Sequence, residues 1–203
     1  MIGIYKYRSS NYFSLISALT KTNIKYKLNE NFESLMKLNK IIIPGVGHVG
    51  SFFEKQDAKK LKNLINDFTK KGGLIYGICL GAQVFLEMSE ESAVRTCSIF
   101  NGRTVQFKKK FKKSMNVGFK ELNHNKKNIF FKKLFKGIEN EKFYFLHKYY
   151  CELEQKNLEK VSFNYENKKL IAAFFKDGVV GTQFHPELSK TAGLKLLRNF
   201  CNL

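Results

Sequence analysis

The chain has 203 residues and a mass of 23.6 kDa, which suits one compact domain. Hydrophobic residues make up 43% of it and charged residues 26%, and this ordinary balance excludes a disordered or collagen-like chain. The longest uncharged apolar stretch, 72–86, is shorter than the roughly 20 residues of a membrane-spanning helix, and the N-terminus has no signal-peptide pattern. We expect a single domain over residues 1–203, in the cytoplasm and without membrane contact.

The formal net charge of +19 raises the question of a nucleic-acid partner, because basic proteins gain affinity by releasing counterions from phosphates. Only four of the 36 basic residues are arginine, whose forked side chain is the usual reader of phosphates and base edges. Lysine is instead spread along the whole chain, as on a generally basic surface. We expect no nucleic-acid partner, and a nucleic-acid-binding module is the lowest-ranked alternative.

The cysteines lie far apart in the sequence and form no C-x-x-C pair. This spacing fits neither a disulfide framework nor a zinc site, so we expect no metal and a functional cysteine that acts alone. The four candidates are Cys79, Cys97, Cys151 and Cys201.

The first half of the sequence alternates short buried strands with amphipathic helices. Residues 41–43 form a β-branched run ended by Pro44 and Gly45, as expected of a strand buried on both faces. This alternation predicts an α/β fold with an open mixed, mostly parallel sheet flanked by helices. The expected strands are 2–5, 24–28, 41–43 and 74–78, and the expected helices are 12–21 and 61–68.

From about residue 99 the pattern changes to shorter alternating pieces, which predicts a more antiparallel second half. The lysine-rich run 108–113 is expected to be a solvated hairpin tip, with a docking surface for an acidic partner as the alternative. The expected elements of this half are strands 104–107, 116–122, 143–146 and 179–184 and an amphipathic helix at 191–201.

Cys79 lies between two glycines, in the pattern Gly77-x-Cys79-x-Gly81, after a buried strand and before an expected helix at 82–88. A side chain held out on a sharp strand-to-helix turn leaves no room for Cβ atoms two residues away on either side. At a helix N-terminus, free amides and the helix dipole favour the thiolate. We therefore predict a cysteine nucleophile, the alternative being a structural cysteine in a tight turn.

A thiolate nucleophile needs a base, and His185 has the best position of the four histidines, His48, His124, His147 and His185. It ends a predicted strand at the carboxyl edge of the sheet, where open α/β folds build their sites. Glu187 lies two residues on, so an extended backbone would project both side chains to one face and let the carboxylate orient the imidazole. The alternative is a plain strand-ending turn with a surface glutamate.

The segment Pro44-Gly45-Val46-Gly47 follows a buried strand and offers flexible backbone with free amides. A nucleophile elbow takes one oxyanion donor from the residue after the nucleophile, here Leu80, and another from a separate loop. We predict that this loop supplies the second donor, with an ordinary type II turn as the alternative.

The segments PGVG, GICLGAQ and GTQFHPELS, in this order, resemble the motifs of the class I (triad) glutamine amidotransferase family. The resemblance covers essentially the full chain and implies a flavodoxin-like fold, a Cys79, His185 and Glu187 triad, and hydrolysis of glutamine without a cofactor. The residues that it implies for holding glutamine are Gly45, Val46, Gly47, Gln83, the backbone around Lys148 and Tyr149, and Glu91, which would meet the substrate ammonium group.

Further segments resemble the glutaminase subunits of imidazole glycerol phosphate synthase. These are 116–119, 145–150 and 192–200, together with Asn11 and Ser14. In such synthases the ammonia passes to a cyclase subunit, a (β/α)8 barrel, that makes imidazole glycerol phosphate for histidine biosynthesis. The resemblance therefore implies a heterodimer with a cyclase subunit.

The chain departs from that pattern in four places. Residues 6–11 read KYRSSN where DYGxGN is usual, 48–49 are His-Val in place of Ala-Phe, Phe119 replaces a tryptophan and Lys148 replaces a serine. These departures leave the triad intact and leave the partner open. The first alternative is a paralogous glutaminase that supplies another synthase, such as a sugar amidotransferase, and the second is an idle regulatory subunit whose pocket Lys148 or Arg8 blocks.

Overall fold

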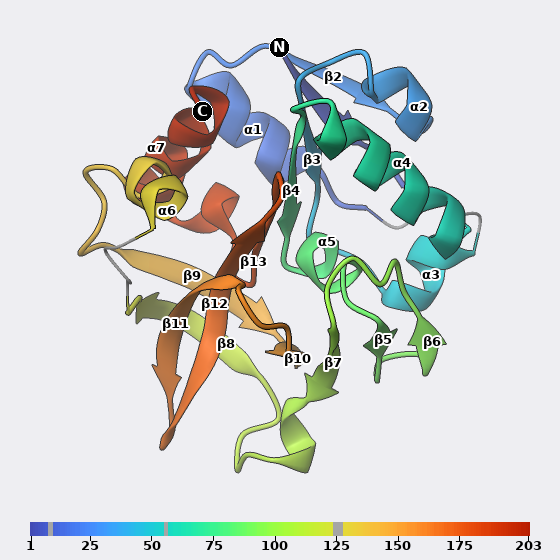
Figure 1. The fold of residues 1–203 in the computed structure, drawn as a ribbon. Helices are drawn as coiled ribbons and strands as arrows, with labels where there is room; N and C mark the ends of the chain where they lie inside the picture. Colours follow the sequence, from blue (N-terminus) through green and yellow to red (C-terminus); the bar gives the residue numbers. More distant parts are fainter. Residues whose placement is uncertain (8–9, 55–56, 124–127) are drawn as a thin grey trace.

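The computed structural model describes residues 1–7, 10–54, 57–123 and 128–203, and its centre is a seven-stranded sheet between two layers of helices (Figure 1). The strand order is β11-β12-β13-β4-β3-β1-β2. Neighbouring strands from β13 to β2 pair in parallel, whereas β11 and β12 pair antiparallel, which confirms the predicted mixed, mostly parallel α/β sheet. The strands are β1 (Ile2–Tyr5), β2 (Tyr26–Asn29), β3 (Lys40–Ile43), β4 (Leu74–Ile78), β11 (Glu159–Tyr165), β12 (Lys168–Lys176) and β13 (Val179–Thr182).

Helices cover both faces of the sheet because successive side chains of its inner strands point to opposite sides and are almost all apolar. In β3, Ile42 packs into the cluster formed with α1, α6 and α7, while Ile41 and Ile43 pack into the cluster formed with α2, α3 and α4. The helices are α1 (Phe13–Lys21), α2 (Phe32–Leu35), α3 (Val49–Phe53), α4 (Ala58–Lys70), α6 (Ile129–Leu134) and α7 (Lys190–Cys201).

The second half of the chain adds two smaller sheets beside the main one, of four strands in the order β10-β7-β5-β6 and of two strands, β8-β9. Most of their pairings are antiparallel, as predicted. The sequence interpretation contained no strand for β11 or β12, although polar and apolar residues alternate along β11 and residues 170–175 of β12 form a continuous apolar run. The added strands are β5 (Met88–Ser89), β6 (Val94–Arg95), β7 (Gly102–Gln106), β8 (Asn116–Glu121), β9 (Lys142–His147) and β10 (Tyr149–Leu153).

Two local predictions are wrong. The helix expected at 82–88 is only α5 (Leu80–Gln83), because the carbonyls of Val84, Phe85 and Leu86 accept hydrogen bonds from the crossing segment 97–100 instead of continuing a helix. The lysine run 108–113 is not a hairpin tip, because β7 and β8 on either side of it belong to different sheets. It begins in a short 3-10 helix, η1 (Phe107–Lys109).

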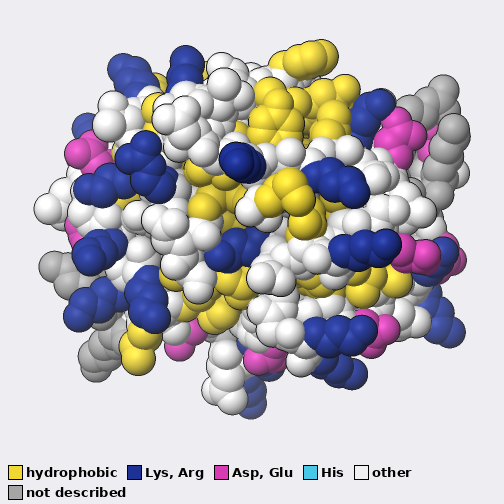
Figure 2. All heavy atoms as spheres, turned by 90° about the horizontal axis from the view of Figure 1, so that it is seen from above, with side chains coloured by type: hydrophobic (Ala, Val, Ile, Leu, Met, Phe, Trp, Pro, Cys, Tyr) yellow, Lys and Arg dark blue, Asp and Glu magenta, His cyan; other side chains and the backbone are white. Residues whose placement is uncertain are grey.

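Basic side chains are dispersed over the face of the molecule that is drawn in Figure 2, which is the view of Figure 1 from above. Figure 2 shows them separated by apolar and neutral surface over this whole face, without one continuous basic stripe. Some lysines elsewhere in the chain are paired with carboxylates, as in Lys6 with Glu30 at 2.6 Å and Lys60 with Glu33 at 3.0 Å. Among the described residues, no helix has the length and apolarity to cross a membrane.

The carboxyl ends of β3, β4 and β13 meet at one edge of the main sheet. Ile43 and Thr182 are the last residues of the two strands that flank β4, and they lie in register with Gly77 and Ile78. The segments that follow these three strands are therefore brought together at this edge.

Candidate active site

Cys79 stands on a sharp turn between β4 and α5, with φ 45° and ψ −102°. A positive φ is costly for a residue with a Cβ, so the surrounding packing must hold this conformation. A Cβ on Gly77 would collide with the backbone of Gly81, and one on Gly81 would collide with the carbonyl of Ile43. Both glycines thus have the steric role that the elbow pattern predicts.

His185 and Glu187 form a hydrogen-bonded pair, Nδ1 to Oε1, at 2.8 Å, and both side chains are almost fully buried. The backbone amide of His185 donates to Tyr144 O at 2.8 Å, and Ser189 Oγ donates to the His185 carbonyl at 2.6 Å. The predicted reason for the pairing is wrong, because Glu187 lies in a 3-10 turn, η2 (Pro186–Leu188), rather than on extended backbone. This turn brings the Glu187 carboxylate within hydrogen-bonding distance of the His185 imidazole.

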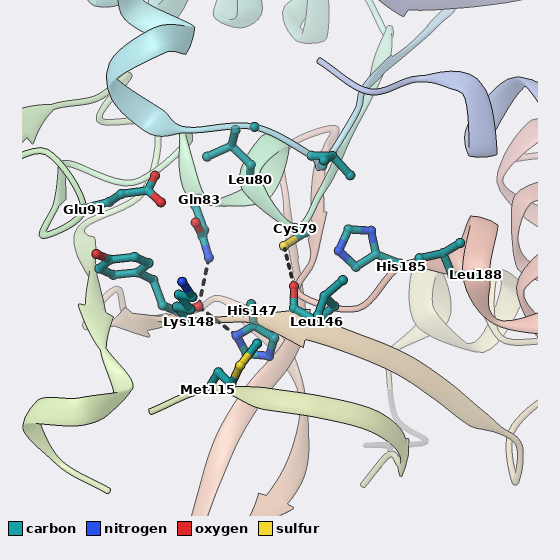
Figure 3. A pocket seen from close by; sticks show the side chains of 14 residues that line it. Cys79, Leu80, Gln83, Glu91, Met115, Leu146, His147, Lys148, His185 and Leu188 are labelled. Carbon is teal, nitrogen blue, oxygen red and sulfur yellow. Dashed lines mark hydrogen bonds between the residues drawn. The ribbon is translucent and has the colours of Figure 1, made fainter. Parts of the chain in front are cut away.

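The imidazole of His185 faces the sulfur of Cys79 (Figure 3). Burial lowers the pKa of His185, but the charge of Cys79, a hydrogen bond with it, and the bonded Glu187 carboxylate together raise this pKa well above its usual 6.5. The arrangement therefore favours an imidazolium next to the sulfur of Cys79. Such a pair holds a nucleophile and a proton donor side by side.

A cavity of about 290 Å³ opens in front of Cys79. Cys79 and His185 lie on one side of it, and Glu91 and Lys148 lie on the other (Figure 3). Among the described residues, no group of three or more His, Cys, Asp and Glu side chains could hold a metal ion. Every residue that the sequence predicted to hold glutamine lines the cavity: Gly45, Val46, Gly47, Leu80, Gln83, Glu91, Lys148 and Tyr149.

The loop after β3 lies directly against the elbow. The Leu80 amide, one of the two predicted oxyanion donors, donates a hydrogen bond to Gly45 O at 3.3 Å. A Cβ on Gly45 would collide with the carbonyl of Ile78, so only glycine permits this approach. The Tyr7 hydroxyl lies 3.1 Å from the carbonyl oxygen of Val46 and tethers the loop from the other side.

His48 and His147 have structural positions. His48 is the N-cap of α3, where its side chain accepts a hydrogen bond from the amide of Gly50. His147 lies in the cavity wall, and burial lowers its pKa to about 3, so it is neutral at pH 7. His124 lies outside the described residues, as does Arg8. Of the histidines that the structure describes, His185 is the one that faces Cys79.

His147 belongs to a hydrogen-bonded wall that sequence reasoning missed. Its Nδ1 lies 2.8 Å from Tyr149 O, and its Nε2 lies 3.0 Å from Asn116 Nδ2. Gln83 Nε2 donates to the same Tyr149 carbonyl at 3.0 Å. The only sequence signal was a histidine at the end of an aromatic strand, whose side chain is typical of a core as well as of a site. The cavity also contains three apolar residues that were not predicted, Met115, Leu146 and Leu188.

Comparison with known proteins agrees with this geometry. Residues 4–203 match the family described as Glutamine amidotransferase class-I. The imidazole glycerol phosphate synthase subunit HisH of Chlorobaculum tepidum is 31% identical over 98% of this chain and 98% of its own. The subunits of the same name from Bacillus subtilis and Leptospira borgpetersenii are 31% and 33% identical over 100% of this chain, and over 96% and 100% of their own.

Solved structures show the same fold at lower identity. A crystal structure described as a glutamine amidotransferase superposes with a TM-score of 0.72 at 16% identity, over 99% of this chain and 97% of that one. PurLQS from Thermotoga maritima superposes with a TM-score of 0.68 at 19% identity, over 99% and 97%. The fold and the elbow thus define an α/β protein with a cysteine exposed to a cavity at the carboxyl edge of its sheet. The chain belongs to the class I glutamine amidotransferase family and is a glutaminase-type enzyme.

Proposed function

We propose that this chain is the glutaminase subunit of imidazole glycerol phosphate synthase. It hydrolyses glutamine and passes the ammonia to a cyclase subunit, a (β/α)8 barrel, in histidine biosynthesis. The relatives that match over their full length share the name of imidazole glycerol phosphate synthase subunit HisH, which supports this pathway. The observation that supports the reaction is the distribution of groups around the cavity. Cys79 and His185, which is bonded to Glu187, lie on one side of it. The oppositely charged side chains of Glu91 and Lys148 lie on the other side.

This distribution of charge suits glutamine. The α-carbon of glutamine carries an ammonium and a carboxylate, which Glu91 and Lys148 would meet, while its side-chain amide would reach Cys79. Glu91 is fixed in place because its Oε2 accepts a hydrogen bond from the Val49 amide at 2.7 Å. Gln83, Tyr149 and the loop 45–47 would complete the binding site.

The first half of the reaction forms a thioester. The Cys79 thiolate attacks Cδ of glutamine, so an S–C bond forms and the carbonyl electron pair moves onto oxygen. The carbonyl then re-forms, the C–N bond breaks, and the His185 imidazolium gives its proton to the departing nitrogen, which leaves as ammonia. Glu187 holds the imidazole in the required orientation throughout.

The second half of the reaction releases glutamate. A water molecule loses a proton to the now neutral His185 and attacks the thioester carbon. The C–S bond breaks, so the products are glutamate and the regenerated Cys79 thiolate beside a protonated His185. Water is the only co-reactant that this balance needs.

The partner would dock on the apolar surface next to the cavity. Phe13, Phe119, Leu146 and Leu188 are large side chains with 38–71% of their surface exposed. Lys190 lies over the Phe119 ring at 5.2 Å from its centroid, which adds a positive charge to this surface. Exposed apolar patches of this kind are typical of protein interfaces.

A paralogous glutaminase for a different synthase, such as a sugar amidotransferase, is the second candidate. It is favoured by the places where the chain departs from the pattern of its relatives, since Lys148 lines the cavity and Phe119 lies on the proposed docking surface. The glutaminase chemistry would be shared, and the acceptor of ammonia would differ. The described residues of segment 6–11 contact the loop 44–47, which in turn contacts Leu80. The departures in this segment therefore also lie close to the cavity.

Glutamate release distinguishes these functions. The purified chain is assayed alone and with the host's histidine-pathway cyclase and its nucleotide ligand, with Cys79→Ala and Cys79→Ser as inactive controls. Strong stimulation by the cyclase supports the imidazole glycerol phosphate synthase role. No stimulation, while a diazo-ketone glutamine analogue still alkylates Cys79 ahead of Cys97, Cys151 and Cys201, supports the second candidate. Full activity in Cys79→Ala would overturn the proposed chemistry.

A further inference from the structure

Gln183 touches the sulfur of Cys79 from the side of the sheet. It follows the last residue of β13, its residue surface is 1% exposed, and its Nε2 donates a hydrogen bond to Cys79 Sγ at 3.5 Å. His185 faces the same sulfur from the cavity side (Figure 3). The sulfur therefore meets a neutral donor in addition to the histidine.

The orientation of the Gln183 amide is set by two successive hydrogen bonds, from Gln83 to the Tyr149 carbonyl and from Gln83 to Gln183. A carbonyl can only accept, so Gln83 must turn its NH2 group toward Tyr149 O, at 3.0 Å. The same NH2 group donates to Gln183 Oε1 at 3.4 Å. Gln183 thus presents its oxygen to Gln83, which leaves its own NH2 group for Cys79.

A second thiol fixes the same orientation. Cys151 Sγ donates to Gln183 Oε1 at 3.5 Å. Burial strongly raises the pKa of the Cys151 thiol, so this group keeps its hydrogen and acts as a donor. Gln83 and Cys151 thus both donate to the oxygen of the Gln183 amide. If this amide were flipped, its NH2 group would face these two donors and the hydrogen bonds would be lost. The favoured orientation is therefore the one in which the NH2 group of Gln183 faces Cys79.

We infer that Gln183 is a further catalytic residue, whose side-chain N–H stabilises the Cys79 thiolate and which Gln83 and Cys151 hold in orientation. The inference rests on the proposed function, because it assigns a task within the Cys79 reaction. A hydrogen bond to the charged form of a group favours that form. The donor is buried and already in place, so it needs no rearrangement when the thiolate is regenerated after each turnover.

The other titratable groups near the sulfur come from several elements. His185 faces it from the start of η2, with Glu187 behind the imidazole. Cys151 approaches from β10, and Tyr7 follows the end of β1; burial raises the pKa of both, so both are neutral at pH 7. Replacing Gln183 by an uncharged residue therefore removes a donor without changing any of these charges.

The test is the pH dependence of Cys79 alkylation by iodoacetamide, followed by peptide mapping, in the full-length chain. Gln183→Met removes the donor with little change in size, and Gln183→Glu keeps an oxygen toward Gln83 but directs a carboxylate at the sulfur. We expect the midpoint pH of alkylation to rise by about one unit in Gln183→Met, and further in Gln183→Glu. The rate at high pH should stay near that of the natural chain. Gln155→Met, the same exchange at a distant glutamine, is the matched control and should leave the midpoint unchanged.

A second readout separates this role from a structural one. For Gln183→Met, kcat/KM for glutamine should fall by up to about tenfold at pH values below the midpoint and recover toward the natural value as the pH rises. A rate that is lower at every pH with an unchanged midpoint would overturn the inference. If neither Gln183 variant folds, the double variant Gln83→Met with Cys151→Ala removes both orienting donors instead, and an unchanged midpoint there would also overturn it. Failure of the natural chain to release glutamate would instead count against the proposed function.

Discussion

The amide of Leu80 donates a hydrogen bond to the carbonyl of Gly45, with 3.3 Å between nitrogen and oxygen. This amide is the oxyanion donor that an elbow normally offers to its substrate. In the observed conformation the donor is therefore occupied by the loop 44–47. For Leu80 to stabilise a tetrahedral intermediate, the Gly45 carbonyl must first move away.

Tyr7 holds the loop in the observed conformation. Its hydroxyl lies 3.1 Å from both the Pro44 and the Val46 carbonyl oxygens, on either side of Gly45. Tyr7→Phe removes the tether, so the loop should leave Leu80 more readily and glutamate release without a partner should rise about fivefold, as expected for a hydrogen bond worth about 1 kcal/mol. The measurement is the rate of glutamate release at saturating glutamine. Tyr26→Phe is the control, and a lower rate in Tyr7→Phe would show that the tether supports the active conformation instead.

The charge of the Glu187 carboxylate should matter for catalysis, because it orients the His185 imidazole and raises the pKa of that group. Among the residues that the structure describes, its Oε2 is buried without a hydrogen-bond partner, while Oε1 bonds to His185. Glu187→Gln keeps the shape but removes the charge and offers His185 an N–H in one orientation, so we expect kcat to fall at least about a hundredfold. Thermal stability should also fall, because the change removes one partner of a buried ion pair and leaves the His185 charge without its carboxylate. Kinetics and melting curves check this, with Glu33→Gln on the surface as control; near-natural kcat would contradict the orienting role.

The elbow could be predicted from sequence because its cause is local. The spacing of Gly77 and Gly81 around Cys79 reflects contacts within a single turn, and His185 and Glu187 are two residues apart. The α/β order of the first half follows equally from local apolar runs. These features can therefore be predicted without knowledge of the tertiary structure.

The hydrogen-bonded network around His147 could not be predicted in the same way. It joins Asn116 on β8, His147 on β9, Gln83 on α5 and Gln183 after β13, and these elements meet only when the three sheets are assembled. The failed helix at 82–88 has a similar cause, since hydrogen bonds from segment 97–100 end it after Gln83. Long-range hydrogen bonds decide both results, and they leave no local pattern in the sequence.

His147 should make stability depend on pH. Burial lowers its pKa from 6.5 to about 3, so its neutral form is favoured in the folded state. Its stabilising contribution is complete above pH 6.5 and is lost as the pH falls toward 3, because the unfolded chain takes up the proton first. Between pH 7 and 4.5 we expect this residue to reduce the free energy of unfolding by about 2 to 3 kcal/mol.

Urea unfolding at both pH values measures that loss, in the natural chain and in His147→Gln. The variant has no imidazole to protonate, so its loss over the same interval should be smaller by about the stated amount. Carboxylates elsewhere contribute equally to both proteins and cancel in the comparison. Equal losses in the two proteins would show that His147 does not titrate with the predicted sign.

Phe119 should affect the partner more than the chemistry. Its ring is 39% exposed on β8, packs edge-on against Tyr144 at 5.3 Å between centroids, and lies under the Lys190 ammonium. Phe119→Ala removes apolar surface from the proposed docking face, and truncation of an aromatic anchor typically costs about 2 kcal/mol of binding. We expect glutamate release without a partner to stay within twofold of the natural rate, while half-maximal stimulation requires about thirtyfold more synthase subunit. Ile129→Ala, at an exposed residue of α6, should leave this concentration unchanged. Equal effects of the two variants would place the docking surface elsewhere.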